Sequence, residues 1–137
     1  MIALFIAGAL THLFVLIIFK PLIARPRPDF SLDQARIIIN TLEDLLPLSI
    51  SIDYAFPSGH ATMAFAGAYI LSSFIKKKTI IFYLLATGVA LSRIYLGKHY
   101  PSDIVAGVLL GLVVGWMAIK ITSWVERTYT LQSAQTK

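Results

Sequence analysis

The chain has 137 residues, of which 57% are hydrophobic and only 14% are charged. This composition is far more apolar than that of an ordinary soluble domain and predicts a membrane protein that folds as one unit. The absence of cysteine excludes disulfides, thiolate nucleophiles and cysteine-based zinc sites. The net charge of +5 suits anionic headgroups or phosphates, although basic residues beside membrane spans are common for orientation alone.

Four apolar stretches predict membrane-spanning helices. The first, 1–19, is apolar except for Thr11 and His12. At about 1.5 Å per residue it just crosses a hydrocarbon core of about 30 Å, and we expect His12 to form a hydrogen bond in helix packing. The other spans are expected at 58–75, 79–96 and 102–121, with an outer loop at 20–57 and a tail at 122–137. The predicted fold is an all-α, polytopic transmembrane helix bundle in a single domain, 1–137.

Local signals set the expected helix boundaries. Pro57 precedes the second span, a run of three lysines at 76–78 ends it, and Gly97 is suited to end the third. The fourth span carries glycine at every fourth position from 107 to 115, which predicts close helix packing without a chemical role. The segment 36–51 alternates apolar and polar faces and predicts a short interfacial helix.

Three clusters of polar residues should share one membrane face. One follows the first span, one opens the second span, and one surrounds the turn between the third and fourth spans. An even number of crossings separates them, whereas the lysines at 76–78 should lie on the opposite face. If that lysine run is cytoplasmic, the clusters face outward. The enrichment of basic residues on the cytoplasmic side gives only weak evidence for this orientation, however. The numbers of basic residues on the two faces are nearly equal, because the loop after the first span also carries four of them.

Each cluster has an ordinary structural interpretation when taken alone. Lys20, Arg25 and Arg27 are suited to anchor the end of a span at the interface. Ser58 after Pro57 is suited to cap a helix, and a carboxylate in a first helical turn is favoured by the helix dipole. The coincidence of all three clusters on one face favours a shared functional site, because polar residues near a bilayer usually pair or serve a function.

The residue types in these clusters suit phosphoryl transfer. Two arginines and one lysine are able to surround phosphate oxygens, and backbone N–H groups at a helix start add donors. Without cysteine, the nucleophile must be sought among Ser, Thr, Lys and His. A neutral imidazole oriented by a carboxylate is one candidate, which His99 and Asp103 supply, and His60 is then available to protonate the leaving oxygen. This scheme requires no metal and no other cofactor.

At these residues the sequence resembles the type-2 phosphatidic acid phosphatase (PAP2) superfamily, in its membrane lipid phosphatase branch. The signature of that family is K-x6-RP, then PSGH, then SR-x5-H-x3-D. All three parts match in order and spacing, which makes the resemblance highly specific. The matching residues are Lys20, Arg27, Pro28, Pro57, Ser58, Gly59, His60, Ser92, Arg93, His99 and Asp103.

The resemblance implies roles for these residues. It implies that His99 is the nucleophile and forms a phosphohistidine, that Asp103 orients it, and that His60 is the general acid. It implies phosphate binding, without a metal, by a further group: Lys20, Arg27, Ser58, Gly59 and Arg93. Arg25 is a competing phosphate ligand, but only Arg27 has the family spacing. Membrane members of the family commonly have six spans, so this chain is a minimal form, lacks N-terminal helices, or is completed by partner subunits such as further copies of itself.

The expected function is therefore removal of phosphate from a membrane lipid. The expected substrates are undecaprenyl diphosphate, phosphatidate or phosphatidylglycerol phosphate, and no nucleic-acid partner is expected. The expected location is a bacterial-type inner membrane, with the site on the extracytoplasmic face. Two alternatives stay open, a vanadate-dependent haloperoxidase and a non-catalytic transporter or assembly subunit. Transporters, however, tend to place ionisable groups near the bilayer midplane, whereas most of these residues lie at helix ends.

Overall fold

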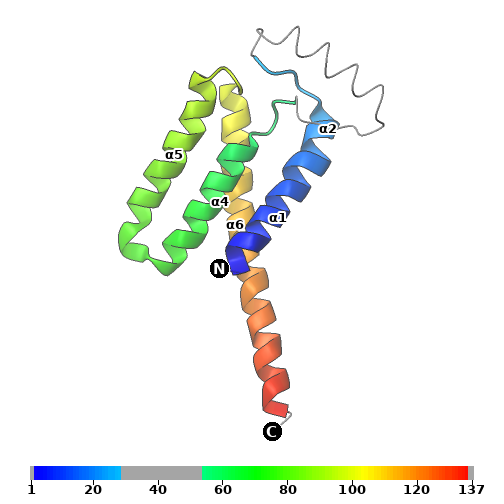
Figure 1. Cartoon of the computed structure of the whole chain (residues 1–137), viewed down its shortest axis with the longest axis vertical. Coiled ribbons are helices and arrows are strands. Elements are labelled where there is room, and N and C mark those ends of the chain that lie inside the picture. Colours follow the sequence, from blue (N-terminus) through cyan, green and yellow to red (C-terminus); the bar gives the residue numbers. More distant parts are fainter. Residues whose placement is uncertain (1, 29–53, 136–137) are drawn as a thin grey trace.

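The computed structural model describes residues 2–28 and 54–135, and within these ranges the chain is helical without any strand (Figure 1). The first apolar stretch is one continuous rod made of three segments. The remaining helices are joined by short turns. In chain order, the elements are α1 (Ile2–Thr11), the π-helix η1 (His12–Phe19), α2 (Lys20–Ile23), α4 (Gly59–Phe74), the 3₁₀ turn η4 (Lys76–Lys78), α5 (Thr79–Tyr95) and α6 (Pro101–Gln135). The expected interfacial helix at 36–51 lies outside the described residues.

Three helices are long and apolar enough to cross a membrane, namely Ile2–Ile23, Lys76–Tyr95 and Pro101–Leu131. These confirm an all-helical integral membrane protein. The fourth expected span corresponds to α4, which is only 16 residues long. At about 1.5 Å per residue its length is about 24 Å, shorter than a typical hydrocarbon core.

α4 contacts all the other long helices of the bundle, α1, α5 and α6. Figure 1 shows α4 with α5 on one side and α1 on the other. The packed residues between α1, α4 and α6 are mostly small, including Ala3, Ala7, Ala66 and Ala118. Small side chains let helices approach closely, and this is how transmembrane helices gain packing contacts.

Two glycines of α6 lie directly against the backbone of α4. A Cβ at Gly107 would lie 2.7 Å from the carbonyl oxygen of Ser58, and one at Gly111 would lie 2.5 Å from that of Thr62. Both distances are too short for a carbon atom beside an oxygen. The predicted packing role of these glycines is therefore confirmed.

Most helix ends agree with the sequence signals. Ser58 caps α4, since its Oγ accepts a hydrogen bond from the Ala61 N–H, and Gly97 adopts a φ of +66° after α5. The turn Lys76–Lys78 lies at the end of α4 opposite its N-terminus (Figure 1). α6 differs, because it continues to Gln135 and not to the expected end near Ile121. No glycine or proline interrupts 122–135, so nothing in the sequence ends the helix there.

Candidate active site

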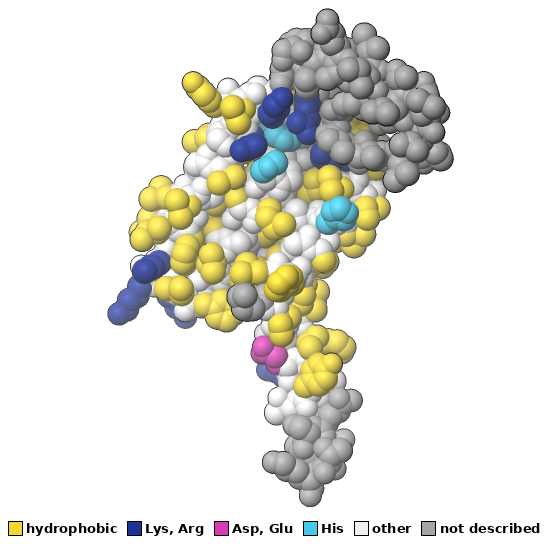
Figure 2. All heavy atoms as spheres, in the orientation of Figure 1, with side chains coloured by type: hydrophobic (Ala, Val, Ile, Leu, Met, Phe, Trp, Pro, Cys, Tyr) yellow, Lys and Arg dark blue, Asp and Glu magenta, His cyan; other side chains and the backbone are white. Residues whose placement is uncertain are grey.

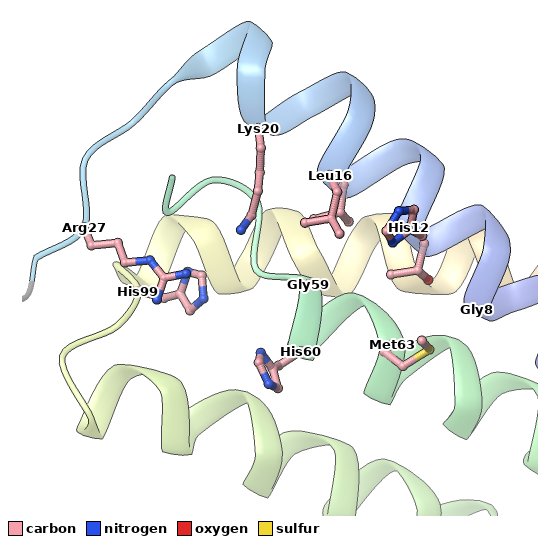
Figure 3. A pocket seen from close by; sticks show the side chains of 11 residues that line it. Gly8, His12, Leu16, Lys20, Arg27, Gly59, His60, Met63 and His99 are labelled. Carbon is pink, nitrogen blue, oxygen red and sulfur yellow. The ribbon is translucent and has the colours of Figure 1, made fainter. Parts of the chain in front are cut away.

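A cavity of about 440 Å³ lies between the first rod and α4. Figure 3 shows Lys20, Arg27 and His99 toward one end of it, and Gly8 and Met63 toward the other. The first end is polar and the second is largely apolar. The lining residues are Gly8, Thr11, His12, Val15, Leu16, Lys20, Arg27, Gly59, His60, Met63 and His99.

The polar end is assembled from four chain segments. Lys20 ends the π-helix and is only 6% exposed. Ala24 then adopts a left-handed φ of 46°, which ends α2 and turns the chain toward Arg27. His60 lies in the first turn of α4, and His99 lies in the short connection between α5 and α6. Helix ends therefore bring together residues that are up to 79 positions apart in the sequence, from Lys20 to His99.

His99 is 5% exposed, and its ring is held by the backbone of another segment. Its Nδ1 lies 2.7 Å from the carbonyl oxygen of Ala55. The Oδ2 of Asp103, which was expected to orient this ring, is 3.7 Å from the same nitrogen. Because a carbonyl oxygen only accepts hydrogen bonds, this geometry assigns the proton to Nδ1 and leaves the lone pair on Nε2.

Burial lowers the pKa of His99 because it disfavours the charged imidazolium. The hydrogen bond to Ala55 and the charge of Asp103 act in the opposite direction, whereas the positive charges of Arg27 and Lys20 lower the pKa further. The net effect is a pKa below the ordinary 6.5. His99 is therefore neutral at neutral pH, as a nucleophile requires.

Asp103 is fully buried, and its carboxylate is bonded on both oxygens. Arg25 donates from Nη1 to Oδ1 at 2.7 Å, and the Tyr100 N–H donates to Oδ2 at 2.8 Å. The same Arg25 nitrogen lies 2.6 Å from Ser102 Oγ, and its guanidinium lies 4.0 Å from the centre of the Tyr100 ring. Arg25 thereby fastens the segment after α2 onto the N-terminus of α6.

Two expected phosphate ligands do not line the cavity. Ser58 is fully buried, and its N–H donates to the Asp103 carbonyl at 3.0 Å, which joins the starts of α4 and α6. Arg93 lies near the end of α5, where its Nε donates to Ser92 Oγ at 3.3 Å. Its charge nevertheless acts on the imidazole of His60, together with the charges of Lys20 and Arg27.

The surface of the molecule reflects this arrangement. Figure 2 shows basic side chains and histidines gathered at the end of the bundle that carries the cavity, while another basic group lies at the far end of α5. Apolar side chains cover the surface between these ends. Within the described residues, no group of three or more His, Asp or Glu side chains is placed to hold a metal ion.

Some features of the site were not predicted from the sequence. The Ala55 carbonyl contributes only backbone, which no motif reveals. Arg25 was considered as an interfacial anchor or as a competing phosphate ligand, but it pairs with Asp103, and Arg27 lines the cavity. His12 was expected to form a hydrogen bond in helix packing, but it is exposed on the cavity and has no hydrogen-bond partner among the described residues.

The family profile described as "PAP2 superfamily" matches residues 1–127, nearly the whole chain. The chain belongs to the PAP2 superfamily. Its resemblance to that family, based on three short motifs, is thereby confirmed.

Two solved structures resemble this fold. Aquifex aeolicus LpxE has 31% identity and a TM-score of 0.59, covering 87% of this chain and 64% of that one. A transmembrane PAP2-type phosphatidylglycerolphosphate phosphatase from Bacillus subtilis has 27% identity and a TM-score of 0.57, covering 90% and 58%.

Curated relatives carry several different names. Decaprenylphosphoryl-5-phosphoribose phosphatase of Mycobacterium tuberculosis is 35% identical over 80% of this chain and 54% of its own length. The bacitracin transport permease protein BcrC of Bacillus licheniformis is 41% identical over 52% of this chain and 37% of its own length. The chain thus spans about half or less of the length of these relatives.

Proposed function

We propose that this PAP2 member is a metal-independent lipid phosphatase that works through a phosphohistidine intermediate. The observation that supports this most strongly is the cavity itself, which is lined by His60, His99, Lys20 and Arg27 and is largely apolar at its other end. Such a cavity suits a lipid whose tail stays in the bilayer while its phosphate reaches polar groups. The proposed substrates are undecaprenyl diphosphate, phosphatidate and phosphatidylglycerol phosphate.

In the first step, Nε2 of His99 attacks the phosphorus atom of the lipid. The N–P bond forms as the P–O bond to the leaving group breaks, and His60 donates a proton to the departing oxygen. The Nδ1–H bond to Ala55 favours this step because it holds the ring in one orientation and keeps the lone pair on Nε2. Asp103 assists through its negative charge, which stabilises positive charge developing on the ring.

In the second step, His60 accepts a proton from water, and the resulting hydroxide attacks the phosphohistidine. The N–P bond breaks, inorganic phosphate leaves, and both histidines return to their starting protonation states. Lys20 and Arg27 neutralise the phosphate oxygens throughout, and the backbone N–H of Gly59 adds a donor at the start of α4. We assign supporting phosphate contacts to Ser58 and Arg93, reached after small movements on binding.

We further propose that α4 is a fourth membrane crossing, shortened because it is enclosed by neighbouring helices. All the site residues then lie on one membrane face, opposite the lysines at 76–78. With that lysine run in the cytoplasm, the site faces the extracytoplasmic side of a bacterial inner membrane. Further copies of the chain would cover the apolar surface that the bundle leaves exposed.

The test is phosphate release by the full chain in detergent, in the presence of a chelator. Each proposed lipid is supplied separately, and wild type is compared with His99→Ala after both have been shown to be folded by circular dichroism. We expect wild type to release phosphate and His99→Ala to release it at least about 1,000-fold more slowly. Removing a nucleophile leaves only binding and electrostatic effects to accelerate the reaction. Full activity in His99→Ala, or activity abolished by the chelator, would contradict it.

A second candidate is transport, favoured by the similarity to the bacitracin transport permease protein BcrC. The discriminating experiment uses proteoliposomes that carry labelled lipid in one leaflet. Movement of the lipid without phosphate release would favour transport, whereas release without movement would favour hydrolysis. Halide oxidation that appears only with added vanadate would instead favour the haloperoxidase alternative.

A further inference from the structure

The hydroxyl group of Thr11, toward the apolar end of the cavity, takes no part in the proposed phosphatase mechanism. Thr11 lines the cavity, is only 5% exposed, and its Oγ1 has no hydrogen-bond partner among the described residues. A buried hydroxyl without a partner is unusual, because it has lost its water and gained nothing in exchange. The protein encloses Oγ1 in this structure, so binding of a ligand by this hydroxyl requires the Thr11 side chain to rotate toward the cavity that the residue lines.

The other threonines in the described chain show that this state is not a general property of threonine here. Each of them donates its hydroxyl to a carbonyl three or four residues earlier, the usual arrangement in a helix. They are Thr62, Thr79, Thr87, Thr122, Thr128 and Thr130. Thr11 is also helical, at the end of α1, but forms no such bond.

The helix geometry changes immediately after Thr11. The π-helix η1 begins at His12, and at its far end the Lys20 N–H bonds to the Val15 carbonyl, five residues earlier. Wide turns of this kind occur frequently at functional sites. As a result, Thr11, His12 and Lys20 all line one cavity, with Thr11 and Lys20 separated by no more than about 13 Å along the helix at 1.5 Å per residue.

We propose that Thr11 donates a hydrogen bond to a carbonyl oxygen of an acylated phospholipid, and that this contact selects such lipids over prenyl diphosphates. A lipid with its phosphate near Lys20 and His99 extends its glycerol and ester region along the cavity wall toward Thr11. A prenyl chain is pure hydrocarbon and leaves the hydroxyl unpaired. Sites built around a hydrogen bond discriminate strongly against analogues that lack it. This inference rests on the proposed phosphatase function and narrows its substrate class.

The test compares two lipids that differ only in the carbonyl groups. Diacyl phosphatidate and its dialkyl ether analogue have the same phosphate, glycerol and tail length. The measured quantity is the ratio of kcat/KM for diacyl over dialkyl, which we expect to be about tenfold in wild type, the equivalent of one neutral hydrogen bond. Undecaprenyl diphosphate is measured in parallel and should be a poorer substrate than the diacyl lipid.

Three variants isolate the hydroxyl. Thr11→Val keeps the shape but removes the donor and should bring the diacyl-to-dialkyl ratio close to one. Thr11→Ser keeps the donor and should retain most of the wild-type ratio. The matched control is Thr87→Val, at an exposed threonine of α5 away from the cavity, which should leave the ratio unchanged.

Different results would contradict the role of Thr11 and the phosphatase proposal. Phosphate release from every lipid with a ratio near one in wild type would overturn this inference and leave the phosphatase proposal intact. An equal ratio in wild type and Thr11→Val would also overturn it, and would indicate that water or a structural role accounts for Thr11. No phosphate release from any lipid would overturn both.

Discussion

Arg25 places its Nη1 atom 2.7 Å from Oδ1 of Asp103, so the buried carboxylate beside His99 is paired with an arginine at a position that the first motif leaves unspecified. Oδ2 of Asp103 lies 3.7 Å from Nδ1 of His99, while the carbonyl oxygen of Ala55 accepts the hydrogen bond from that nitrogen. Asp103 therefore acts as the centre of a small network that ties the segment after α2 to the start of α6.

Removing Arg25 should damage both stability and activity. Arg25→Gln leaves the buried Asp103 carboxylate with one fewer charged partner, a loss of about 1–3 kcal/mol in the free energy of unfolding. It also loosens the segment that carries Arg27, so kcat/KM should fall about tenfold. The melting temperature in detergent and kcat/KM check this. Arg127→Gln, at an exposed arginine far along α6, is the matched control, and equal effects of the two substitutions would contradict the assigned role.

Close packing of α6 on α4 predicts that Gly111 tolerates no side chain. In Gly111→Ala the new Cβ would lie 2.5 Å from the Thr62 carbonyl oxygen, so the helices must separate. We expect a clear drop in melting temperature. Gly88→Ala on α5 is the control, because a Cβ there meets nothing within 4 Å, and it should be neutral or slightly stabilising. A stable Gly111→Ala protein would show that the helices are less tightly packed than described.

The two roles assigned to Ser58 are separable by substitution. Ser58→Ala and Ser58→Gly both remove the hydroxyl, but loss of an N-cap costs about 1 kcal/mol with alanine and only a few tenths with glycine. If the hydroxyl also contacts phosphate, both variants should raise KM equally while only Ser58→Ala loses appreciable stability. An unchanged KM in both variants would limit Ser58 to capping α4.

The pH dependence should follow the protonation of His99. Its pKa is lowered below 6.5, so the imidazole stays neutral until the pH falls below that value, and the acid limb of kcat/KM should lie below pH 6.5. The positive charge of Arg27 is one of the causes, so Arg27→Gln should raise the pKa and move the acid limb to higher pH. Arg127→Gln should leave the limb in place. A limb that moves to lower pH in Arg27→Gln would contradict this electrostatic account.

Much of the fold could be predicted from the sequence because short-range features of the sequence determine it. Apolar length, the Ser58 cap, the glycine after α5 and the glycine spacing of α6 each act within a few residues. The even number of expected membrane crossings between the polar clusters, together with the motif spacing, then predicted which residues share one site. The π-helix was not predicted, because no local signal in the sequence marks it. The expected second span at 58–75 agrees closely with the bounds of α4, and its crossing of the membrane stays a prediction.

The site was harder to predict where the motifs do not specify the partner residue. Family spacing selected Arg27 over Arg25, and the cavity supports that choice, but nothing in the sequence showed that Arg25 would pair with Asp103. The Ala55 carbonyl could not be anticipated, because any residue type supplies the same backbone group. Thr11 was treated as one polar residue in an apolar span, since a missing hydrogen bond is visible only in three dimensions.

The most direct test of the central claim is to trap the phosphorylated enzyme. The full chain is mixed with lipid carrying a labelled phosphate, quenched within milliseconds, and digested to locate the label. The account predicts an acid-labile, alkali-stable label on His99 that is absent from His99→Ala. Label on a serine or an aspartate, or rapid turnover in which His99 never becomes labelled, would contradict it.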